Sequence, residues 1–409
     1  MNDETTHTAS VSLRYLFFTF LKVGTVSFGG NMGLISVVKN IMVDKDKKLE
    51  HEVILEALSI GSLLPGPLAV NVVAYIGYTL RKTTGAVVSM VAILLPAVTV
   101  MLILSWLYFQ YGWNQQFSGI MTYITGAIAA IILTVAAQFY VKELKGNLTK
   151  TLLAALAIVS VVFSNSFALT MLLLVAGGFA GWLLKLNTGN TIAKAPGFYA
   201  SGKKKMDAIT IILWTTLSLL LLLFLSSAYK PVNNIPAQIA IVFSGISLSL
   251  FGGGYVMIPI MQSLFVNELL WLTNQEFLDA ITFSQVTPGP ILVSATFIGY
   301  KLYGFWGALL ATVCIFAPSA ILMILVSKIY TRINHLSMVK HILAGVKAIV
   351  IGLIAGAAIK IGMQVSWSIP LAIITVISFV LSYFYKASPV YIILSCLLAG
   401  IILWYFNVG

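Results

Sequence analysis

The chain contains Phe28-Gly29-Gly30 followed by Pro65-Gly66-Pro67, and the same order returns as Phe251-Gly252-Gly253 followed by Pro288-Gly289-Pro290. Both motifs recur at a spacing of 223 positions. The match continues at a spacing of 222, through Ile76-Gly77-Tyr78 with Ile298-Gly299-Tyr300, Gly85 with Gly307, Pro96 with Pro318 and Trp182 with Trp404. Such an ordered series indicates an internal repeat. We therefore predict two homologous halves, residues 11–186 and 234–408, with residues 187–233 between them.

The sequence around these motifs is apolar. Hydrophobic residues make up 59% of the 409 residues and charged residues only 9%, against about 25% in soluble proteins. Runs such as 208–228 and 304–326 are long enough to cross a bilayer core of about 30 Å. They are apolar on all sides and do not alternate, which excludes a membrane β-barrel. We predict an all-α polytopic membrane protein.

The number of apolar segments predicts the topology. Each half holds six segments, in the first half about 12–38, 52–80, 86–110, 119–142, 149–164 and 167–186, and the run 207–229 is an unpaired thirteenth. Each half has an even number of segments, so one extra membrane span between them gives the second half the opposite orientation in the membrane. The two halves then form an inverted repeat. A cytoplasmic N-terminus then puts most basic residues inside. The remaining exception, the Lys-rich loop at 39–48, disappears if the first two segments of each half are re-entrant or broken at their motifs.

Charge and cysteine content exclude several kinds of partner. The net charge of +12 lies mainly in short loops between apolar runs, so topology explains it and we predict no nucleic-acid partner. Cys314 and Cys396 both fall in apolar runs, and the four histidines lack a metal-ligand spacing. We predict no metal and no cofactor. No phosphate-binding loop is found, which argues against an ATP-driven pump.

The repeated motifs are the candidate substrate site. Adjacent glycines favour an opened helix whose free N–H groups and positive dipole end face an anion, although close helix packing is an alternative. No helix runs straight through Pro-Gly-Pro, because proline lacks a donor and clashes with the preceding turn. A plain kink is the alternative there. The candidate residues are Ser27, Gly29, Gly30, Pro65, Gly66, Pro67, Gly252, Gly253, Gln285, Thr287, Pro288, Gly289 and Pro290.

Ionisable residues within apolar runs are further candidates, because such groups are costly in a membrane. Lys22 and Lys347 could each place an ammonium beside a bound anion, and snorkelling to an interface is the alternative for Lys22. Glu56 and Asp279 each lie nine residues before a Pro-Gly-Pro motif. They are candidates for protonatable coupling groups, or for acids at the membrane interface.

At these motif pairs the sequence closely resembles the chromate ion transporter family, whose members carry a Phe-Gly-Gly element and then a Pro-Gly-Pro element in each half. The resemblance runs from Phe17 to about Trp404 and corresponds to the two-domain, single-chain form. It implies a secondary transporter of the bacterial inner membrane that exports chromate, with sulfate as a similar tetrahedral dianion. One departure is Asn31, where the family often has proline.

The partners expected on this reading are a small inorganic anion and the lipid bilayer, and a homodimer is left open. The protein is not expected to be an enzyme. Two other functions compete with anion transport. A divalent cation transporter would use Glu56 and Asp279 as ligands, whereas an enzyme acting on a lipid phosphate would need clustered His, Asp or Arg that the sequence lacks.

Overall fold

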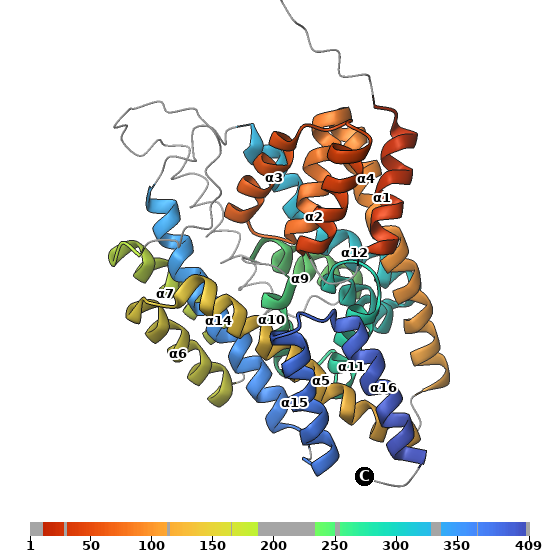
Figure 1. Cartoon of the computed structure of the whole chain (residues 1–409), viewed down its shortest axis with the longest axis vertical. Coiled ribbons are helices and arrows are strands. Elements are labelled where there is room, and N and C mark those ends of the chain that lie inside the picture. The colour runs from red at the N-terminus through yellow and green to blue at the C-terminus, as the bar shows by residue number, and fades with distance from the viewer. Residues whose placement is uncertain are drawn as a thin grey trace, which may run out of the picture.

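The computed structural model describes residues 11–27, 31–112, 115–164, 166–186, 234–249, 254–328, 337–365 and 367–405. Every regular element in these ranges is helical, which confirms the predicted all-α fold (Figure 1). Four helical stretches within them are long and apolar enough to cross a membrane: Leu68–Tyr111, Thr122–Leu144, Ile291–Ser327 and Lys340–Met363. The Phe-Gly-Gly candidates Gly29, Gly30, Gly252 and Gly253 and the run 207–229 lie outside the described residues.

The first half starts with two pairs of helices, and each pair flanks one of the motifs. Helix α1 (Leu13–Val26) precedes Phe28-Gly29-Gly30, and α2 (Asn31–Lys39) follows it and continues as the π-helical turn η1 (Asn40–Lys45). Helices α3 (His51–Leu63) and α4 (Leu68–Tyr111) flank the first Pro-Gly-Pro motif, where Gly66 has a φ of 112°. The predicted break at Pro65-Gly66-Pro67 is thus present.

The second half repeats this order. Its interrupted helices are α9 (Ile235–Ser249), η3 (Gly254–Val256), α10 (Met257–Gln262), η4 (Ser263–Glu268), α11 (Asn274–Val286), η5 (Ile291–Val293) and α12 (Ser294–Ser327). The break at Pro288-Gly289-Pro290 lies between α11 and η5, and Gly289 has a φ of 121°. Both glycines adopt backbone angles that residues with a Cβ rarely tolerate, which explains why glycine stands between the prolines.

Helices α4 and α12 are each sharply bent into two arms. The backbone leaves helical geometry at Arg81 and Lys82 in α4 and at Tyr303 and Gly304 in α12. A Cβ on Gly77 would lie 2.4 Å from the carbonyl oxygen of Gly85. Residues eight apart in a straight helix are separated by about 12 Å, so the chain turns back here. We call the parts before and after each bend the short arm and the long arm.

The ends of the first interrupted helices lie side by side. The Tyr15 hydroxyl at the start of α1 donates to Asp46 Oδ2, just after η1, at 2.6 Å. The Arg81 guanidinium, at the end of the short arm of α4, donates to the Val11 carbonyl oxygen. The chain therefore leaves this side along α1, returns along η1, leaves again along α3 and returns along the short arm.

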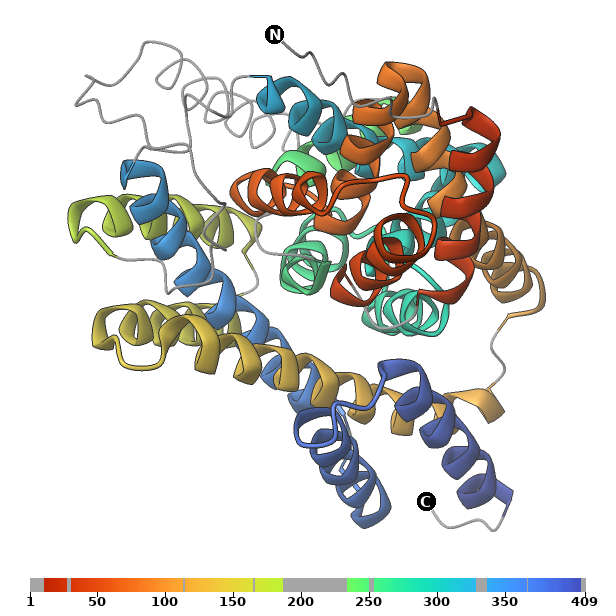
Figure 2. The same cartoon turned by 45° about the horizontal axis from the view of Figure 1, so that its top comes forward.

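The helices form two bundles that each draw on both halves (Figures 1 and 2). The motif bundle contains α1–α4 and α9–α12, in which α1 packs on α4, α9 on α12, and α4 on α12. The support bundle contains α5 (Gln115–Phe139), the π-helical turn η2 (Tyr140–Leu144), α6 (Leu148–Phe163), α7 (Phe167–Leu183), α14 (Ser337–Met363), α15 (Ile369–Tyr383) and α16 (Pro389–Tyr405). In it α14 crosses α6 and α7, while α5 crosses α15 and α16, so equivalent helices exchange partners between the halves.

Candidate functional site

The two Pro-Gly-Pro breaks lie where the halves interlock. The backbone N–H of Gly289 donates to the carbonyl oxygen of Ser27 at 3.0 Å, which joins the second break to the end of α1. A Cβ on Gly289 would lie 3.0 Å from the Cβ of Ala97, and a Cβ on Gly66 would lie 2.2 Å from the Cβ of Ser319. Ala97 and Ser319 directly follow the repeated prolines of the two long arms. Each break is therefore packed by the long arm of the other half.

A polar cluster fills the first break. Asn71 Nδ2 donates to the Pro65 carbonyl oxygen at 3.4 Å, and the Ser319 hydroxyl donates to Asn71 Oδ1 at 3.1 Å. The Ser319 N–H donates to the Ser247 hydroxyl at 3.3 Å. Asn71, Ser247 and Ser319 are fully buried. This cluster was not among the predicted site residues, although an asparagine inside an apolar run, four residues after a proline, was a detectable signal.

The second break differs, because it carries buried polar atoms without a hydrogen-bond partner among the described residues. These atoms are Ser27 Oγ, Gln285 Nε2 and Ser294 Oγ, and their residues are 3%, 6% and 0% exposed. The other end of the Gln285 amide is held, since the Tyr255 hydroxyl donates to Gln285 Oε1 at 3.2 Å. The predicted donor Thr287 is engaged, because its hydroxyl donates to the Ser284 carbonyl oxygen at 3.1 Å.

These unpaired groups suit a ligand that only accepts hydrogen bonds. An amide N–H and a hydroxyl can both donate, and a tetrahedral oxyanion offers acceptors alone. Helix α12 begins directly after η5, so its positive dipole end lies next to the break. Leaving buried donors unpaired costs roughly 1–3 kcal/mol each, which a bound anion would recover.

The two candidate coupling acids occupy different environments. Asp279 is 2% exposed, and it accepts hydrogen bonds from the Tyr108 hydroxyl at 2.8 Å and from Gln275 Nε2 at 2.9 Å. Tyr108 lies on the long arm of α4, so this contact joins the halves. Glu56 is exposed and hydrogen-bonds to Tyr75, on the short arm of α4.

Glu56 and Asp279 are not brought together as ligands of one cation. Their tyrosine partners lie about 9 Å and about 39 Å from the bend of α4 along the two arms, given a rise of 1.5 Å per residue. Within the described residues no group of three or more His, Cys, Asp or Glu side chains is arranged to hold a metal ion.

The two candidate lysines do not join the breaks either. Lys22 is exposed, on the same stripe of α1 as Phe18 and Val26, which are 55% and 51% exposed. Lys347 lies in the support bundle, where its ammonium is 3.4 Å from Glu143 Oε1.

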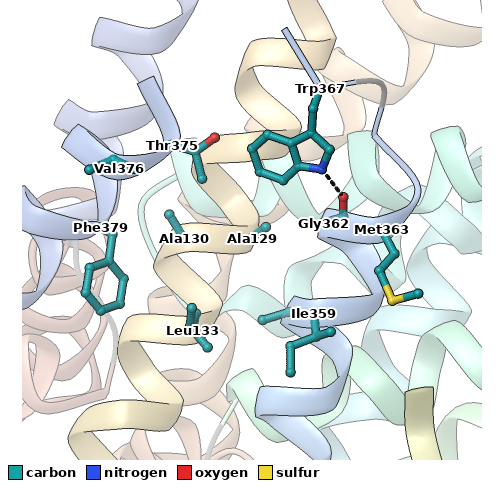
Figure 3. A pocket seen from close by; sticks show the side chains of 11 residues that line it. Ala129, Ala130, Leu133, Ile359, Gly362, Met363, Trp367, Thr375, Val376 and Phe379 are labelled. Carbon is teal, nitrogen blue, oxygen red and sulfur yellow. Dashed lines mark hydrogen bonds between the residues drawn. The ribbon is translucent and has the colours of Figure 1, made fainter. Parts of the chain in front are cut away.

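The support bundle also contains an apolar cavity of about 440 Å³ between α5, α14 and α15 (Figure 3). Its polar groups are already engaged: Trp367 Nε1 donates to the Gly362 carbonyl oxygen at 3.0 Å, and the Thr375 hydroxyl donates to the Leu371 carbonyl oxygen at 2.8 Å. The remaining lining is apolar, as Ala130, Leu133 and Phe379 illustrate. The cavity therefore offers no donors for an oxyanion.

Comparison with known proteins identifies the family. The family model described as "Chromate transporter" matches residues 14–182 and 237–401. The chain belongs to the chromate transporter family. It is 28% identical to the chromate transport protein of Cupriavidus metallidurans, over 97% of this chain and 94% of that protein. It is 26% identical to the probable chromate transport protein of Synechococcus elongatus, over 96% of each chain.

A third relative is the chromate transport protein of Pseudomonas aeruginosa, which is 27% identical over 97% of this chain and 94% of that protein. No solved structure matches the chain. Membership of the family, together with the apolar helices, makes the chain a multi-pass membrane transporter and not an enzyme. Membership of the family implies a small anion as the substrate and the lipid bilayer as the setting.

Proposed function

We propose that this chain is a secondary transporter that exports chromate, or a similar tetrahedral oxyanion such as sulfate, across the bacterial inner membrane. Its N-terminus is cytoplasmic in this proposal. Family membership and the names of the relatives support the substrate class. The unpaired donors at the second break are the observation that carries the site.

The proposal includes an inverted repeat of residues 11–186 and 234–408, with an unpaired transmembrane helix in 187–233. The contact between Tyr108 and Asp279 supports the inversion. Tyr108 lies about 39 Å along the long arm from its bend, which exceeds a hydrocarbon core of about 30 Å. The start of α11 is thus on the side opposite the bend of α4, whereas its counterpart α3 starts near Asp46, on the same side as that bend.

The same geometry supports re-entrant helices. Helices α1, α3 and the short arm of α4 have 13 or 14 residues each, about 20 Å, which is too short to cross the membrane. Their interruptions then lie near the middle of the bilayer. Non-helical backbone at that depth is tolerated where protein or a water-filled pathway covers it. In this proposal both Pro-Gly-Pro motifs line the pathway.

In the proposed site the Gln285 amide and the Ser27 and Ser294 hydroxyls donate to the oxyanion beside Gly289. Lys22 and Lys347 do not contact the anion in this proposal, because Lys22 is exposed on α1 and Lys347 is paired with Glu143. Their positive charges attract the anion only over a longer distance. Neutral donors hold a dianion without trapping it, and this favours release. The negative interior drives the outward step, since moving a dianion outward gains about 4.6 kcal/mol per 100 mV.

Proton coupling is part of the proposal and is assigned to Asp279. This carboxylate is buried, and its two hydrogen bonds come from Tyr108 of the first half and Gln275 of the second. A change in its protonation would weaken a contact between the halves, and relative movement of the halves is what alternating access requires. Glu56, which is exposed, has the weaker case for this role.

The test is accumulation of chromate and of sulfate in inside-out vesicles with a lumen-positive potential. The wild-type protein should accumulate chromate, and Gln285→Leu should lose most of this accumulation. Gln364→Leu, an exposed glutamine at the end of α14, is the matched control and should behave as wild type. A wild-type protein that moves neither anion would refute the proposed function. Cross-linking of the same vesicles would establish whether the transporter is a homodimer.

A further inference from the structure

Two lysines from different halves converge on one tyrosine ring. The Lys82 ammonium lies 5.7 Å from the centre of the Tyr78 ring, and the Lys328 ammonium lies 5.9 Å from it. Both ammonium groups are therefore within about 12 Å of each other, although cations repel. Arg81 adjoins Lys82 in the chain, and its guanidinium binds the Val11 carbonyl oxygen. Three cations thus gather where the arms of α4 meet and the long arm of α12 ends.

These cations are not neutralised within the described parts of the chain. The ion pairs found there join Lys39 with Asp44, Lys301 with Glu276 and Lys347 with Glu143, and none includes Arg81, Lys82 or Lys328. All three residues are exposed. Neither α4 nor α12 contains an acidic residue, and the acids Asp46 and Glu56 on this side hydrogen-bond to Tyr15 and Tyr75. The cluster therefore keeps a net positive charge towards the medium.

The backbone of Lys82 is a second observation. Its φ of 53° and ψ of −146° fall in a region that is used almost only by glycine. The equivalent residue of the other half is Gly304, with a φ of 57° and a ψ of −149°. A lysine at this position carries backbone strain that the glycine of the other half avoids. Strain retained at one of two equivalent turns points to a use for the side chain.

The equivalent turn of the second half has a different character. Tyr300, the counterpart of Tyr78, stacks against Phe109, and the centres of the two rings are 6.1 Å apart. Lys301 is neutralised by Glu276 at 2.5 Å, and the counterpart of Lys328 is Trp106. The bend of α4 is thus basic and exposed, whereas the equivalent bend of α12 carries aromatic residues and a paired lysine.

We infer that Lys82 and Lys328, together with Arg81, form a site that collects tetrahedral oxyanion dianions. The site lies at the mouth of the transport pathway on the side of the membrane where the N-terminus of the chain lies. The inference rests on the proposed function. The short arm of α4 joins this site to the first break, since Tyr78 lies about 18 Å along the helix from Gly66. A site of this charge raises the local concentration of the dianion before it enters the pathway. The sidedness suits export, because the pathway would collect anions where the N-terminus lies.

The experiment measures the initial rate of chromate uptake by proteoliposomes of neutral phosphatidylcholine, with equal salt on both sides, from 10 mM to 300 mM. For a dianion about 8 Å from each ammonium, each lysine should be worth about fourfold in rate at 10 mM salt and about twofold at 100 mM. Lys82→Gly and Lys328→Gln should therefore be slower than wild type at low salt, with a flatter salt dependence, and should approach it at high salt.

Lys386→Gly is the matched control. Lys386 is also an exposed lysine with a positive φ, of 53°, but it lies between α15 and α16 in the support bundle. It should keep the wild-type salt dependence. The melting temperature of Lys82→Gly should be at least that of wild type, because the glycine relieves strain, so a slower rate cannot reflect misfolding.

Two outcomes would overturn the inference alone. One is a Lys82→Gly Lys328→Gln double variant whose rate and salt dependence match wild type while wild type transports chromate. The other is an effect of these variants that appears only when phosphatidylglycerol is added, which would assign the cations to lipid headgroups. A wild-type protein that moves neither chromate nor sulfate would instead overturn the proposed function, and this inference with it.

Discussion

Alanine at the two Pro-Gly-Pro glycines should destabilise the protein to different extents. Gly66 and Gly289 have similar φ angles, 112° and 121°, so alanine carries a similar backbone penalty of roughly 1–3 kcal/mol at both. Their surroundings differ. At Gly66 the new Cβ would lie 2.2 Å from the Ser319 Cβ and 2.8 Å from Asn71 Nδ2, whereas at Gly289 the nearest atom is the Ala97 Cβ at 3.0 Å.

The difference between the two variants therefore isolates packing. Overlaps of the kind found at Gly66 cost about 1–3 kcal/mol beyond the backbone term, because Ser319 and Asn71 are fully buried and must shift together. We expect Gly66→Ala to melt at a lower temperature than Gly289→Ala, and both to melt below wild type. The assay heats the detergent-solubilised protein, which carries a fluorescent fusion partner. The fluorescence that remains in solution at each temperature gives the melting temperature.

A second substitution separates the two costs. Ser319→Gly removes both the Cβ and the hydroxyl that the new methyl group would meet. We compare the effect of Gly66→Ala on stability in the Ser319→Gly background with its effect in the wild-type background. In the Ser319→Gly background the loss of stability due to the overlap with Ser319 should disappear, and the loss due to the backbone angle of residue 66 should remain. Equal melting temperatures for the two single variants, or a lower one for Gly289→Ala, would refute the interlocked arrangement of the breaks.

Three further predictions test other parts of the structure. Tyr108→Phe leaves the buried Asp279 carboxylate with one hydrogen bond fewer, so it should lower stability by about 1–3 kcal/mol and alter the pH dependence of transport; unchanged melting and pH profiles would contradict this. Leu270 is an exposed residue in the loop between η4 and α11. With the native cysteines replaced, Leu270→Cys should react with an impermeant maleimide from outside intact cells and Arg81→Cys should not; the same reactivity at both sites would rule out inversion. Gly345→Ala places a Cβ 1.9 Å from a carbonyl oxygen of α7, so it should lower the melting temperature by several degrees, and wild-type melting would refute the close crossing.

The sequence was most informative where backbone chemistry is decisive. Proline without an N–H and glycine at positive φ force a break wherever they fall, so the interruptions at Gly66 and Gly289 could be located before the structure was known. Apolar length likewise identified the helical class. The bend of α4 at Arg81 and Lys82 also lies in the gap expected between the segments 52–80 and 86–110.

The partners of individual side chains could not be predicted, because they come from helices far apart in the sequence. Ser319 packs against Gly66 across 253 positions, and nothing local to either residue signals this. The candidate lysines illustrate the same limit. Hydropathy placed Lys22 and Lys347 in apolar runs, but the face of the helix on which each lies depends on tertiary packing. The asymmetry between the breaks, with Asn71 satisfied at one and Gln285 half-satisfied at the other, also arises from packing.

Equilibrium binding of labelled sulfate and chromate to the purified protein tests most directly whether the oxyanion binds to the donors at the second break, which have no partner among the described residues. Ser27→Ala and Ser294→Ala each remove one donor, and each should raise the dissociation constant about tenfold or more, since a hydrogen bond to a charged group is worth about 1.5–3 kcal/mol. Ser89→Ala is the control, because Ser89 Oγ is also buried without a partner among the described residues but lies beside Gly77, at the bend of α4. Weaker binding in the first two variants, with wild-type binding by Ser89→Ala, is the predicted result. Wild-type affinity in all three variants would contradict the account.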